Sequence, residues 1–217
     1  MKDRMHPNIC VSLAGLSARE ILIAIRGLRM AEIRLDGMKL EREDIKTIFS
    51  TSVELIATCR PGNLNDRDRA ELLIGAIDSG ASYVDIEIES KKRYRESIIK
   101  EAKKVGCKVI LSYHNYEMTP SESKLKSIVD RCKYYGGDIV KIACRANSYS
   151  DSARLLGLLG RNGNIVVVGM GEKGRITRIV APILGSPFTF ASLSKGMETA
   201  DGQIELGELK RMMEVLT

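Results

Sequence analysis

The sequence predicts an α/β fold, a single (β/α)8 TIM barrel built on parallel strands. Short apolar, strand-like runs alternate with longer amphipathic segments along the whole chain, and eight such pairs can be counted. A chain of 217 residues, of which 44% are hydrophobic, is long enough to bury the core of one such barrel. No linker or low-complexity stretch interrupts the rhythm, so we expect residues 1–217 to form one domain. An open, doubly wound sheet is the alternative, although no G-x-G-x-x-G motif follows the first strand.

The expected strands are short, mostly apolar runs, and each is followed by a segment with the periodicity of an amphipathic helix. The strands are expected at Ile9–Leu13, Glu32–Asp36, Val53–Thr58, Tyr83–Glu87, Lys108–Tyr113, Ile139–Ala143, Ile165–Gly169 and Phe188–Ala191. The helices are expected at Ser17–Arg26, Asp44–Phe49, Asp66–Ser79, Lys91–Val105, Ser121–Tyr134, Ser148–Leu159, Ile176–Leu184 and Glu205–Leu216.

Several boundaries between these elements have local causes. Gly80, Gly106 and the pair Gly136–Gly137 fall where helices must stop, and glycine readily adopts the backbone conformation that ends a helix. The segment Thr119–Ser121 contains a proline and indicates a turn into a helix, with Ser121 as its N-cap.

The second and fourth strands carry charged residues on one face and apolar residues on the other. The charged residues are Glu32, Arg34 and Asp36 on the second strand, and Asp85, Glu87 and Glu89 on the fourth. A charged sheet face open to water is common in antiparallel proteins but not in parallel α/β folds. We therefore expect these side chains to line the mouth of the barrel, where inward residues alternate with residues that face the helices.

Two more side chains are expected at the same rim. Arg60 closes the third strand, and the proline and glycine that follow it turn the chain there. His114 follows the apolar run Val109–Leu111; the only other histidine is His6, near the N-terminus. The alternatives are an ordinary loop arginine and a hydrogen-bonded histidine without a catalytic role.

The sixth strand contains a lysine inside the apolar run Asp138–Ala143. Burying an ammonium is costly unless it is paired or loses its proton, and a neutral amine can attack a carbonyl. Lys141 is therefore a candidate Schiff-base nucleophile. The alternative is a strand that ends early, from which Lys141 reaches water. His114 on the preceding strand would supply an acid–base partner, which favours the nucleophile.

The glycine-rich segment Gly169–Arg175 follows the seventh strand, where many barrels bind phosphate through backbone amides. A flexible lid or a tight turn are the other interpretations of this segment. No spaced set of histidine, cysteine and carboxylate residues predicts a metal site.

Composition restricts the class of partner. The net charge of +6 suits nucleic acid or a small anion, but the basic residues are scattered among acids and only 5% of residues are aromatic, so no nucleic-acid surface is predicted. The five cysteines lack any C-x-x-C pair and are expected to be reduced and buried. No apolar stretch approaches the ~18 residues of a membrane span, and Met1–His6 leads into no signal-type region. We expect a cytoplasmic protein that does not enter a membrane.

A series of motifs runs through the chain in a fixed order. They are Val11-Ser12-Leu13, Glu32-x-Arg34-x-Asp36, Thr58-Cys59-Arg60, Asp85-Ile86-Glu87, Ser112-Tyr113-His114-Asn115 with Thr119-Pro120, Asp138-Ile139-Val140-Lys141-Ile142-Ala143, Gly174 through Arg178, and Gly202-Gln203-Ile204. Together they resemble the type I 3-dehydroquinate dehydratases of the shikimate pathway, nearly from end to end.

The resemblance implies a catalytic barrel that removes water from the anionic substrate 3-dehydroquinate to give 3-dehydroshikimate, without metal or organic cofactor. It implies that Lys141 forms an imine with the ring ketone, while His114 takes the C2 proton and returns a proton to the leaving hydroxyl. It also implies a homodimer.

The same resemblance assigns residues around the substrate. Those expected to bind it or line its pocket are Ser12, Glu32, Arg34, Arg60, Met170, Arg178, Phe190, Thr199, Ala200 and Gln203. Arg178 and Gln203 would hold the carboxylate, because an arginine offers a planar donor fork. Glu32, Arg34 and Arg60 would meet the ring hydroxyls.

The chain departs from the family pattern at two places. Many members carry a glutamate shortly after the arginine that matches Arg60, where it helps to orient the histidine. The loop Pro61–Asp66 has no glutamate, which leaves Asn63, Asp66 or another group for that task. Asp201 stands where a proline often precedes Gly-Gln.

Two other functions stay open from the sequence alone. One is a class I aldolase acting on a phosphorylated sugar, although Arg178 with Gln203 favours a carboxylate. The other is a noncatalytic barrel that binds an anion or nucleic acid.

Overall fold

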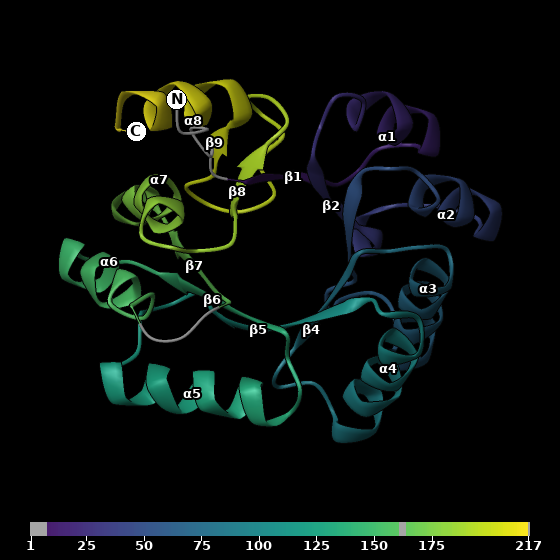
Figure 1. The fold of residues 1–217 in the computed structure, drawn as a ribbon, viewed down its shortest axis with the longest axis horizontal. Helices are drawn as coiled ribbons and strands as arrows, with labels where there is room; N and C mark the ends of the chain where they lie inside the picture. The colour runs from purple at the N-terminus through teal and green to yellow at the C-terminus, as the bar shows by residue number, and fades with distance from the viewer. Residues whose placement is uncertain (1–7, 161–163, 217) are drawn as a thin grey trace, which may run out of the picture.

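The computed structural model describes residues 8–160 and 164–216, which form one curled sheet with helices around its outside (Figure 1). The strand order is β7-β6-β5-β4-β3-β2-β1-β8-β9, and the pairings found in the described residues are all parallel. The predicted α/β barrel class is confirmed. His6 and the rest of residues 1–7 lie outside the described residues.

Strands and helices alternate along the chain. The strands are β1 (Ile9–Leu13), β2 (Met30–Arg34), β3 (Glu54–Thr58), β4 (Tyr83–Glu87), β5 (Lys108–Asn115), β6 (Ile139–Arg145), β7 (Ile165–Met170), β8 (Thr189–Ser192) and β9 (Ile204–Glu205). The helices are α1 (Ala18–Ala24), α2 (Arg42–Phe49), α3 (Asp66–Asp78), α4 (Lys92–Val105), α5 (Glu122–Tyr134), α6 (Tyr149–Leu156), α7 (Arg175–Ile183) and α8 (Leu206–Leu216). Short 3-10 turns occupy Leu35–Gly37 and Glu172–Gly174.

The eight expected strands and eight expected helices are all present; β1 and β4 have the expected ends, and each of the other elements differs at one end or at both. β2 finishes at Arg34 because the next three residues form a 3-10 turn, so the prediction that Asp36 belongs to this strand is wrong. β4 finishes at Glu87, and Glu89 is exposed beyond it rather than on the inward face. β9 was not expected, because a strand of two residues leaves no alternation to detect.

The predicted helix boundaries are confirmed where glycine was the reason. Gly80, Gly106 and Gly136 follow α3, α4 and α5 with φ values of 107°, 76° and 89°, a left-handed region that favours glycine. Ser121 caps α5 by accepting a hydrogen bond from the Lys124 backbone N–H at 3.4 Å.

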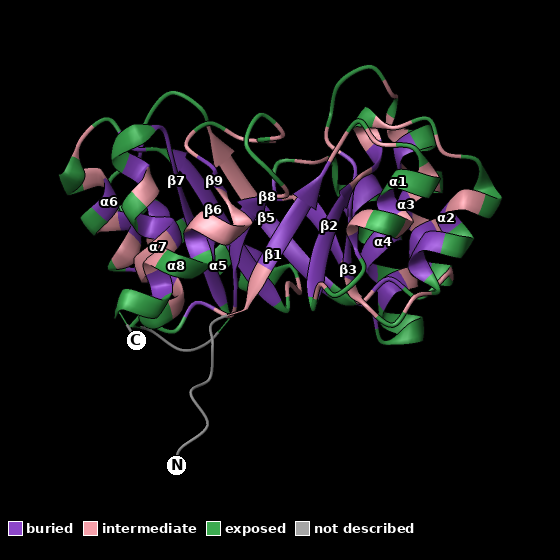
Figure 2. Cartoon of the chain, turned by 90° about the horizontal axis from the view of Figure 1, so that it is seen from above, coloured by how far each residue is buried: buried purple, intermediate pink, exposed green. Residues whose placement is uncertain are grey.

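The two largest apolar clusters form layers that hold the barrel together. The larger layer lies between the strands and the surrounding helices and includes Leu13, Ile33, Leu111 and Leu125. The smaller one fills the inside of the barrel: Cys10, Met30, Ile56, Ile110, Ile139, Ala143, Val166, Val168, Phe188 and Phe190. Figure 2 shows the result, with buried strands enclosed by helices whose outer faces are exposed.

The barrel has a seam. β7 and β8 follow each other around it (Figure 1), but the described residues form no backbone ladder between them. The ladder instead runs continuously from β7 through β1 to β8 and ends on β9, which pairs with β8. The chain segments that follow β7 and β8 contact each other where the Gly171 N–H donates to the Asp201 carbonyl at 3.3 Å, although β7 and β8 themselves are not paired in the described part of the chain.

Two chain-wide expectations concern thiols and membrane spans. The five cysteines are buried and unbonded to one another, as expected, and burial raises the pKa of Cys107, Cys132 and Cys144 to about 12. Within residues 8–160 and 164–216, none of the helices is both long and apolar enough to traverse a bilayer.

Candidate active site

Inward side chains change from apolar to polar toward the carboxyl ends of the strands. Residues two apart on a strand share a face, and on five strands an inward apolar residue is followed by an inward polar one, whereas on β7 Val166 is followed by Val168. The pairs are Cys10 and Ser12, Met30 and Glu32, Ile56 and Thr58, Ile110 and Ser112, and Ile139 and Lys141. The first member of each pair belongs to the inner core, and the second faces the mouth of the barrel.

A cavity of about 180 Å³ opens at this mouth. It is lined by every residue that the sequence predicted for catalysis or substrate binding: Lys141, His114, Ser12, Glu32, Arg34, Arg60, Met170, Arg178, Phe190, Thr199, Ala200 and Gln203. Five lining residues were not predicted, namely Tyr116, Ala143, Arg145, Val168 and Asp201. A larger cavity of about 380 Å³, lined among others by Leu28, Arg29 and Lys210, contains none of the predicted residues.

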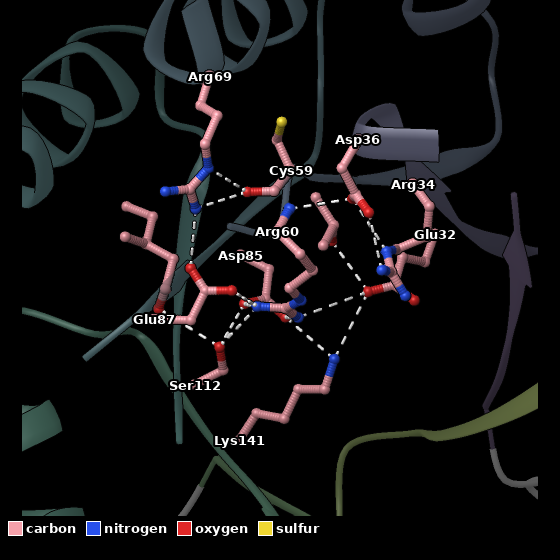
Figure 3. A network of polar contacts seen from close by, with 12 residues as sticks. Glu32, Arg34, Asp36, Cys59, Arg60, Arg69, Asp85, Glu87, Ser112 and Lys141 are labelled. Atoms are coloured by element: carbon pink, nitrogen blue, oxygen red, sulfur yellow. Dashed lines mark hydrogen bonds and ion pairs between the residues drawn. The ribbon is translucent and has the colours of Figure 1, made fainter. Parts of the chain in front are cut away.

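Lys141 is buried in the middle of β6, with 6% of its surface exposed. Its Nζ lies 3.0 Å from Asp85 Oδ2 and 3.5 Å from Glu32 Oε1 (Figure 3). The same Nζ lies 4.1 Å from the centre of the Phe190 ring. The alternative of a strand that ends early is wrong, because β6 continues to Arg145. The apolar strand sequence did not show the two carboxylates, which come from β2 and β4.

Asp85 is the most highly connected of these carboxylates. Arg60 donates to both of its oxygens at 2.9 and 2.7 Å, and the Ser112 hydroxyl donates at 2.6 Å. Burial raises the pKa of a carboxyl, but the charges of Arg60 and Lys141 outweigh it and hold the pKa of Asp85 well below its usual range. Asp85 is therefore ionised at neutral pH.

Glu32 is held by hydroxyl groups from the neighbouring strands. Ser12 Oγ donates to one carboxylate oxygen at 2.8 Å and Thr58 Oγ1 donates to the other at 2.9 Å. Burial opposes ionisation here too, but Lys141 and Arg60 lower the pKa of Glu32 below its ordinary value. Two negative charges consequently face the one lysine.

Arg60 is fixed by a chain of contacts that leads away from the cavity. Its Nη1 lies 2.6 Å from Glu87 Oε1, and the other Glu87 oxygen accepts from Arg69 Nη2 at 3.1 Å (Figure 3). Arg69, on α3, also donates to the Cys59 carbonyl at 3.1 and 2.7 Å. The sequence did not reveal Arg69, because a helix that starts Asp-Arg-Asp-Arg predicts a solvated face rather than one buried arginine.

Arg34 and Asp36 form a pair at the edge of the cavity. Arg34 Nη2 lies 2.9 Å from Asp36 Oδ2, and Arg34 Nε donates to Asp36 Oδ1 at 3.1 Å. Asp36 Oδ1 also accepts from the Arg60 backbone N–H at 3.0 Å. Asp36 thus ties the 3-10 turn after β2 to the end of β3.

His114 lies near the end of β5 with its Nδ1 buried and without a hydrogen-bond partner among the described residues. Desolvation, followed by the positive charges of Arg60 and Lys141, lowers the pKa of His114 well below its usual value. The imidazole is therefore neutral at pH 7. Among the described residues, no hydrogen bond joins His114 to Asn63 or Asp66; the Tyr116 ring stacks beside it, with 6.1 Å between ring centres.

Arg178, on α7, is 1% exposed and incompletely paired. Its Nη2 donates to the Asp201 carbonyl at 3.2 Å, and its Nε has no partner among the residues that the structure describes. Burial lowers the pKa of Arg178 to about 10, against the opposing charge of Asp201. A buried cation with an unpartnered donor in a cavity wall has the chemistry to hold an anion.

Gln203 supports the same interpretation. Its Oε1 accepts from the Thr199 backbone N–H at 2.7 Å and from the Thr199 hydroxyl at 3.2 Å. The amide NH2 group is thereby left as the donor for a ligand. Arg178 and Gln203 both line the cavity.

The glycine-rich segment after β7 is a tight turn. Gly169 and Gly174 are so close that a Cβ added to Gly174 would lie 2.3 Å from the Gly169 carbonyl carbon. Thr177 Oγ1 accepts from the Gly169 N–H at 2.7 Å and donates to the Gly174 carbonyl at 2.8 Å. These contacts fix the start of α7 and so the position of Arg178. No cluster of three or more potential metal ligands occurs within the part of the chain that the structure describes.

Comparisons with known proteins agree on one family. The model of the type I 3-dehydroquinase family matches residues 9–217. The 3-dehydroquinate dehydratase of Methanocaldococcus jannaschii is 35% identical over 195 residues, which cover 86% of this chain and 87% of that protein. The crystal structure of the 3-dehydroquinate dehydratase from Aquifex aeolicus is similar with a TM-score of 0.82 and 30% identity, covering 96% of this chain and 98% of that one. The enzyme of the same name from Geobacillus kaustophilus has a TM-score of 0.86 at 22% identity, covering 98% and 91%, and so compares the fold alone.

Proposed function

The chain belongs to the type I 3-dehydroquinase family and catalyses the dehydration of 3-dehydroquinate in the shikimate pathway; within that activity, we propose that Lys141 is the imine-forming nucleophile and His114 the general acid and base. One observation carries the proposal: a buried lysine and a neutral histidine line the same cavity. An amine and a proton acceptor are the two groups that an imine route needs.

The reaction starts when the Lys141 amine attacks the ring ketone and water leaves, which forms an imine. The protonated imine nitrogen draws electrons from the ring and acidifies the neighbouring C2 hydrogen. Neutral His114 takes that proton and leaves an enamine. The enamine expels the C1 hydroxyl as His114 returns the proton, so that water departs. Hydrolysis of the imine then releases 3-dehydroshikimate and Lys141.

The carboxylates beside Lys141 have a role in this sequence. The iminium nitrogen carries the positive charge that the free lysine ammonium would carry, at the same place. Asp85 and Glu32, at 3.0 and 3.5 Å from Nζ, are already ionised and fixed by hydroxyl and guanidinium donors. Their charges stabilise the iminium without reorganisation when it forms.

Arg178 and Gln203 would bind the substrate carboxylate. Arg178 presents an unpaired Nε, and Gln203 has its amide NH2 group available. Glu32, Arg34 and Arg60 line the same cavity and would contact the ring hydroxyls. The aldolase and noncatalytic alternatives are not retained, because the family match spans the catalytic motifs.

The test is to trap the imine. The purified protein is incubated with 3-dehydroquinate, reduced with borohydride and digested, and the added mass is located by peptide mass spectrometry, with a sample lacking substrate as control. A reduced adduct on Lys141 is the expected result. Dehydration without an adduct on Lys141, or an adduct on another lysine, would reject the assignment of the nucleophile.

A further inference from the structure

An ion pair spans the mouth of the cavity and has no part in the reaction steps above. Arg145, the last residue of β6, places its Nη1 2.9 Å from Oδ2 of Asp201, which lies in the connection between β8 and β9. The two side chains are 45% and 59% exposed, and both residues line the cavity. The pair therefore bridges two separate strand ends across the site.

The backbone of Asp201 connects this pair to the proposed carboxylate site. Its carbonyl accepts hydrogen bonds from Arg178 Nη2 at 3.2 Å and from the Gly171 N–H at 3.3 Å. Arg145 therefore holds the side chain of Asp201, while the main chain of Asp201 contacts Arg178. A displacement of Asp201 would change the position of both Arg178 and Gln203.

Gly202 allows the segment to approach the end of β7 closely. It has φ of 74°, and an added Cβ would lie 2.6 Å from the Gly171 carbonyl oxygen. The ion pair lies beside Gly171, since a Cβ added to Gly171 would lie 3.8 Å from Asp201 Oδ2 and 3.9 Å from the Arg145 guanidinium carbon. The backbone contact between Gly202 and Gly171 and the ion pair between Arg145 and Asp201 together hold this short segment against β6 and β7.

We propose that Arg145 and Asp201 are positioning residues, whose ion pair holds residues 199–203 against the ends of β6 and β7 so that Arg178 and Gln203 are aligned for the substrate carboxylate. This inference rests on the proposed carboxylate site. Neither side chain touches the reacting atoms; the pair acts through Asp201 and the residues bonded to it.

The structure predicts a specific kinetic signature. The carboxylate is held equally in the ground state and the transition state, so loss of the pair should raise KM and leave kcat unchanged. Because both side chains are about half exposed, the effect should be about two- to fivefold, the range that exposed ion pairs supply. Salt should reduce the difference between variant and wild type, since it screens such pairs.

The experiment is a double-mutant cycle on KM for 3-dehydroquinate with wild type, Arg145→Gln, Asp201→Asn and the double variant. We expect each single variant to raise KM about two- to fivefold, and the double variant to equal a single one. The matched control is Arg67→Gln with Glu71→Gln, which removes an exposed pair of 3.0 Å on α3 and should leave KM unchanged.

Three outcomes would overturn the inference. The first is that Asp201→Asn leaves KM unchanged. The second is additive effects of the two substitutions. The third is a lower KM in Asp201→Asn with a higher one in Arg145→Gln, because a freed Arg145 would then bind the substrate directly. Borohydride trapping on Lys141 in the same samples tests the proposed mechanism separately, since the ion pair takes no part in imine formation.

Discussion

Lys141 lies between two ionised carboxylates, and this setting changes what its removal should do. An apolar strand would accept alanine easily, so the sequence predicts a folded, inactive Lys141→Ala variant. In the structure, the substitution also leaves Asp85 and Glu32 without one of their cations. We expect no turnover and a free energy of unfolding lower by about 3 kcal/mol, the low end for a broken buried pair, because Arg60 still pairs with Asp85.

The matched control for this prediction is Lys141→Arg. It keeps a positive charge beside the carboxylates but is always protonated and cannot form the imine. Turnover should be absent in both variants, while urea unfolding should show a smaller loss of stability in Lys141→Arg. Measurable dehydration by either variant would contradict the role of Lys141.

His114 leads to a prediction about pH. Its pKa is lowered in the folded protein, so the imidazole stays neutral well below pH 6.5 and remains able to accept a proton. We expect kcat/KM to show no loss of a single essential base near pH 6.5 and to decline only at more acidic pH. The measurement is the pH profile of kcat/KM for wild type. An acid limb with an inflection at 6.5 would show that His114 is not desolvated as the structure indicates.

Arg178 should act mainly on binding. Arg178→Ala removes a charged hydrogen-bond donor to the substrate carboxylate, which is worth about 1.5–3 kcal/mol, so KM should rise by about 10- to 150-fold. Steady-state kinetics separate this from a change in kcat. Arg178→Lys keeps the charge without the planar donor fork and should give an intermediate KM. If KM were normal in the alanine variant, another group would hold the carboxylate.

Prediction from sequence correctly placed at the mouth of the barrel the residues that their own strands reveal, and their roles in catalysis and binding stay predictions. Lys141 is a polar residue inside an apolar run, His114 follows an apolar run at its carboxyl end, and Glu32 alternates with buried neighbours. It failed for Arg69, Arg145 and Asp201, whose importance depends on partners far away in sequence. No local pattern distinguishes such residues from ordinary solvated charges.

Among the elements, the turn between β7 and α7 determines the position of Arg178. Gly174→Ala would place a Cβ 2.3 Å from a backbone carbon of Gly169, so the turn must move and α7 with it. We expect a lower free energy of unfolding and a higher KM, measured by urea unfolding and steady-state kinetics. Gly75→Ala in α3 is the control; nothing lies within 4 Å of its added Cβ, and it should stabilise the protein by about 0.5–1 kcal/mol. A variant at Gly174 with unchanged KM would separate the turn from the carboxylate site.

The sequence predicted element type better than element ends. The alternation of charged and apolar residues identified β2 and β4, but it continues through Asp36 and Glu89, past the points where the backbone leaves the sheet. Backbone hydrogen bonding decides where a strand stops, and side-chain periodicity does not report it. β9 depends entirely on its pairing with β8 and has no signal of its own.

For the whole molecule, the buried charges predict how stability depends on pH. Asp85 and Glu32 have lower pKa values in the folded protein than the values near 3.9 and 4.3 expected when unfolded, so the unfolded state takes up protons first as pH falls. Their contribution is complete above about pH 5 and is lost as pH falls through the folded-state values. His114 adds a loss that begins near its unfolded pKa of about 6.5, because only the unfolded histidine gains a proton there.

We therefore expect the free energy of unfolding to decrease steadily from pH 7 to pH 3 in urea titrations at fixed ionic strength. His114→Gln should remove the part of the decrease between pH 7 and pH 5 and keep the rest. A stability that stays constant down to pH 4 would contradict the charge network.

The homodimer implied by the resemblance stays a prediction, as does a cytoplasmic location.

Because β7 and β8 are not paired at the seam of the described chain, a bound substrate would also connect two parts of the barrel. Arg178 stands on α7, which follows β7 after a 3-10 turn, and Gln203 stands in the connection that follows β8, immediately before β9. A carboxylate bound by both residues would join the chain segments on the two sides of the one gap in the ladder of the described strands. A bound substrate would therefore link the two strand ends that the backbone ladder leaves unlinked, and this link would be lost each time product is released.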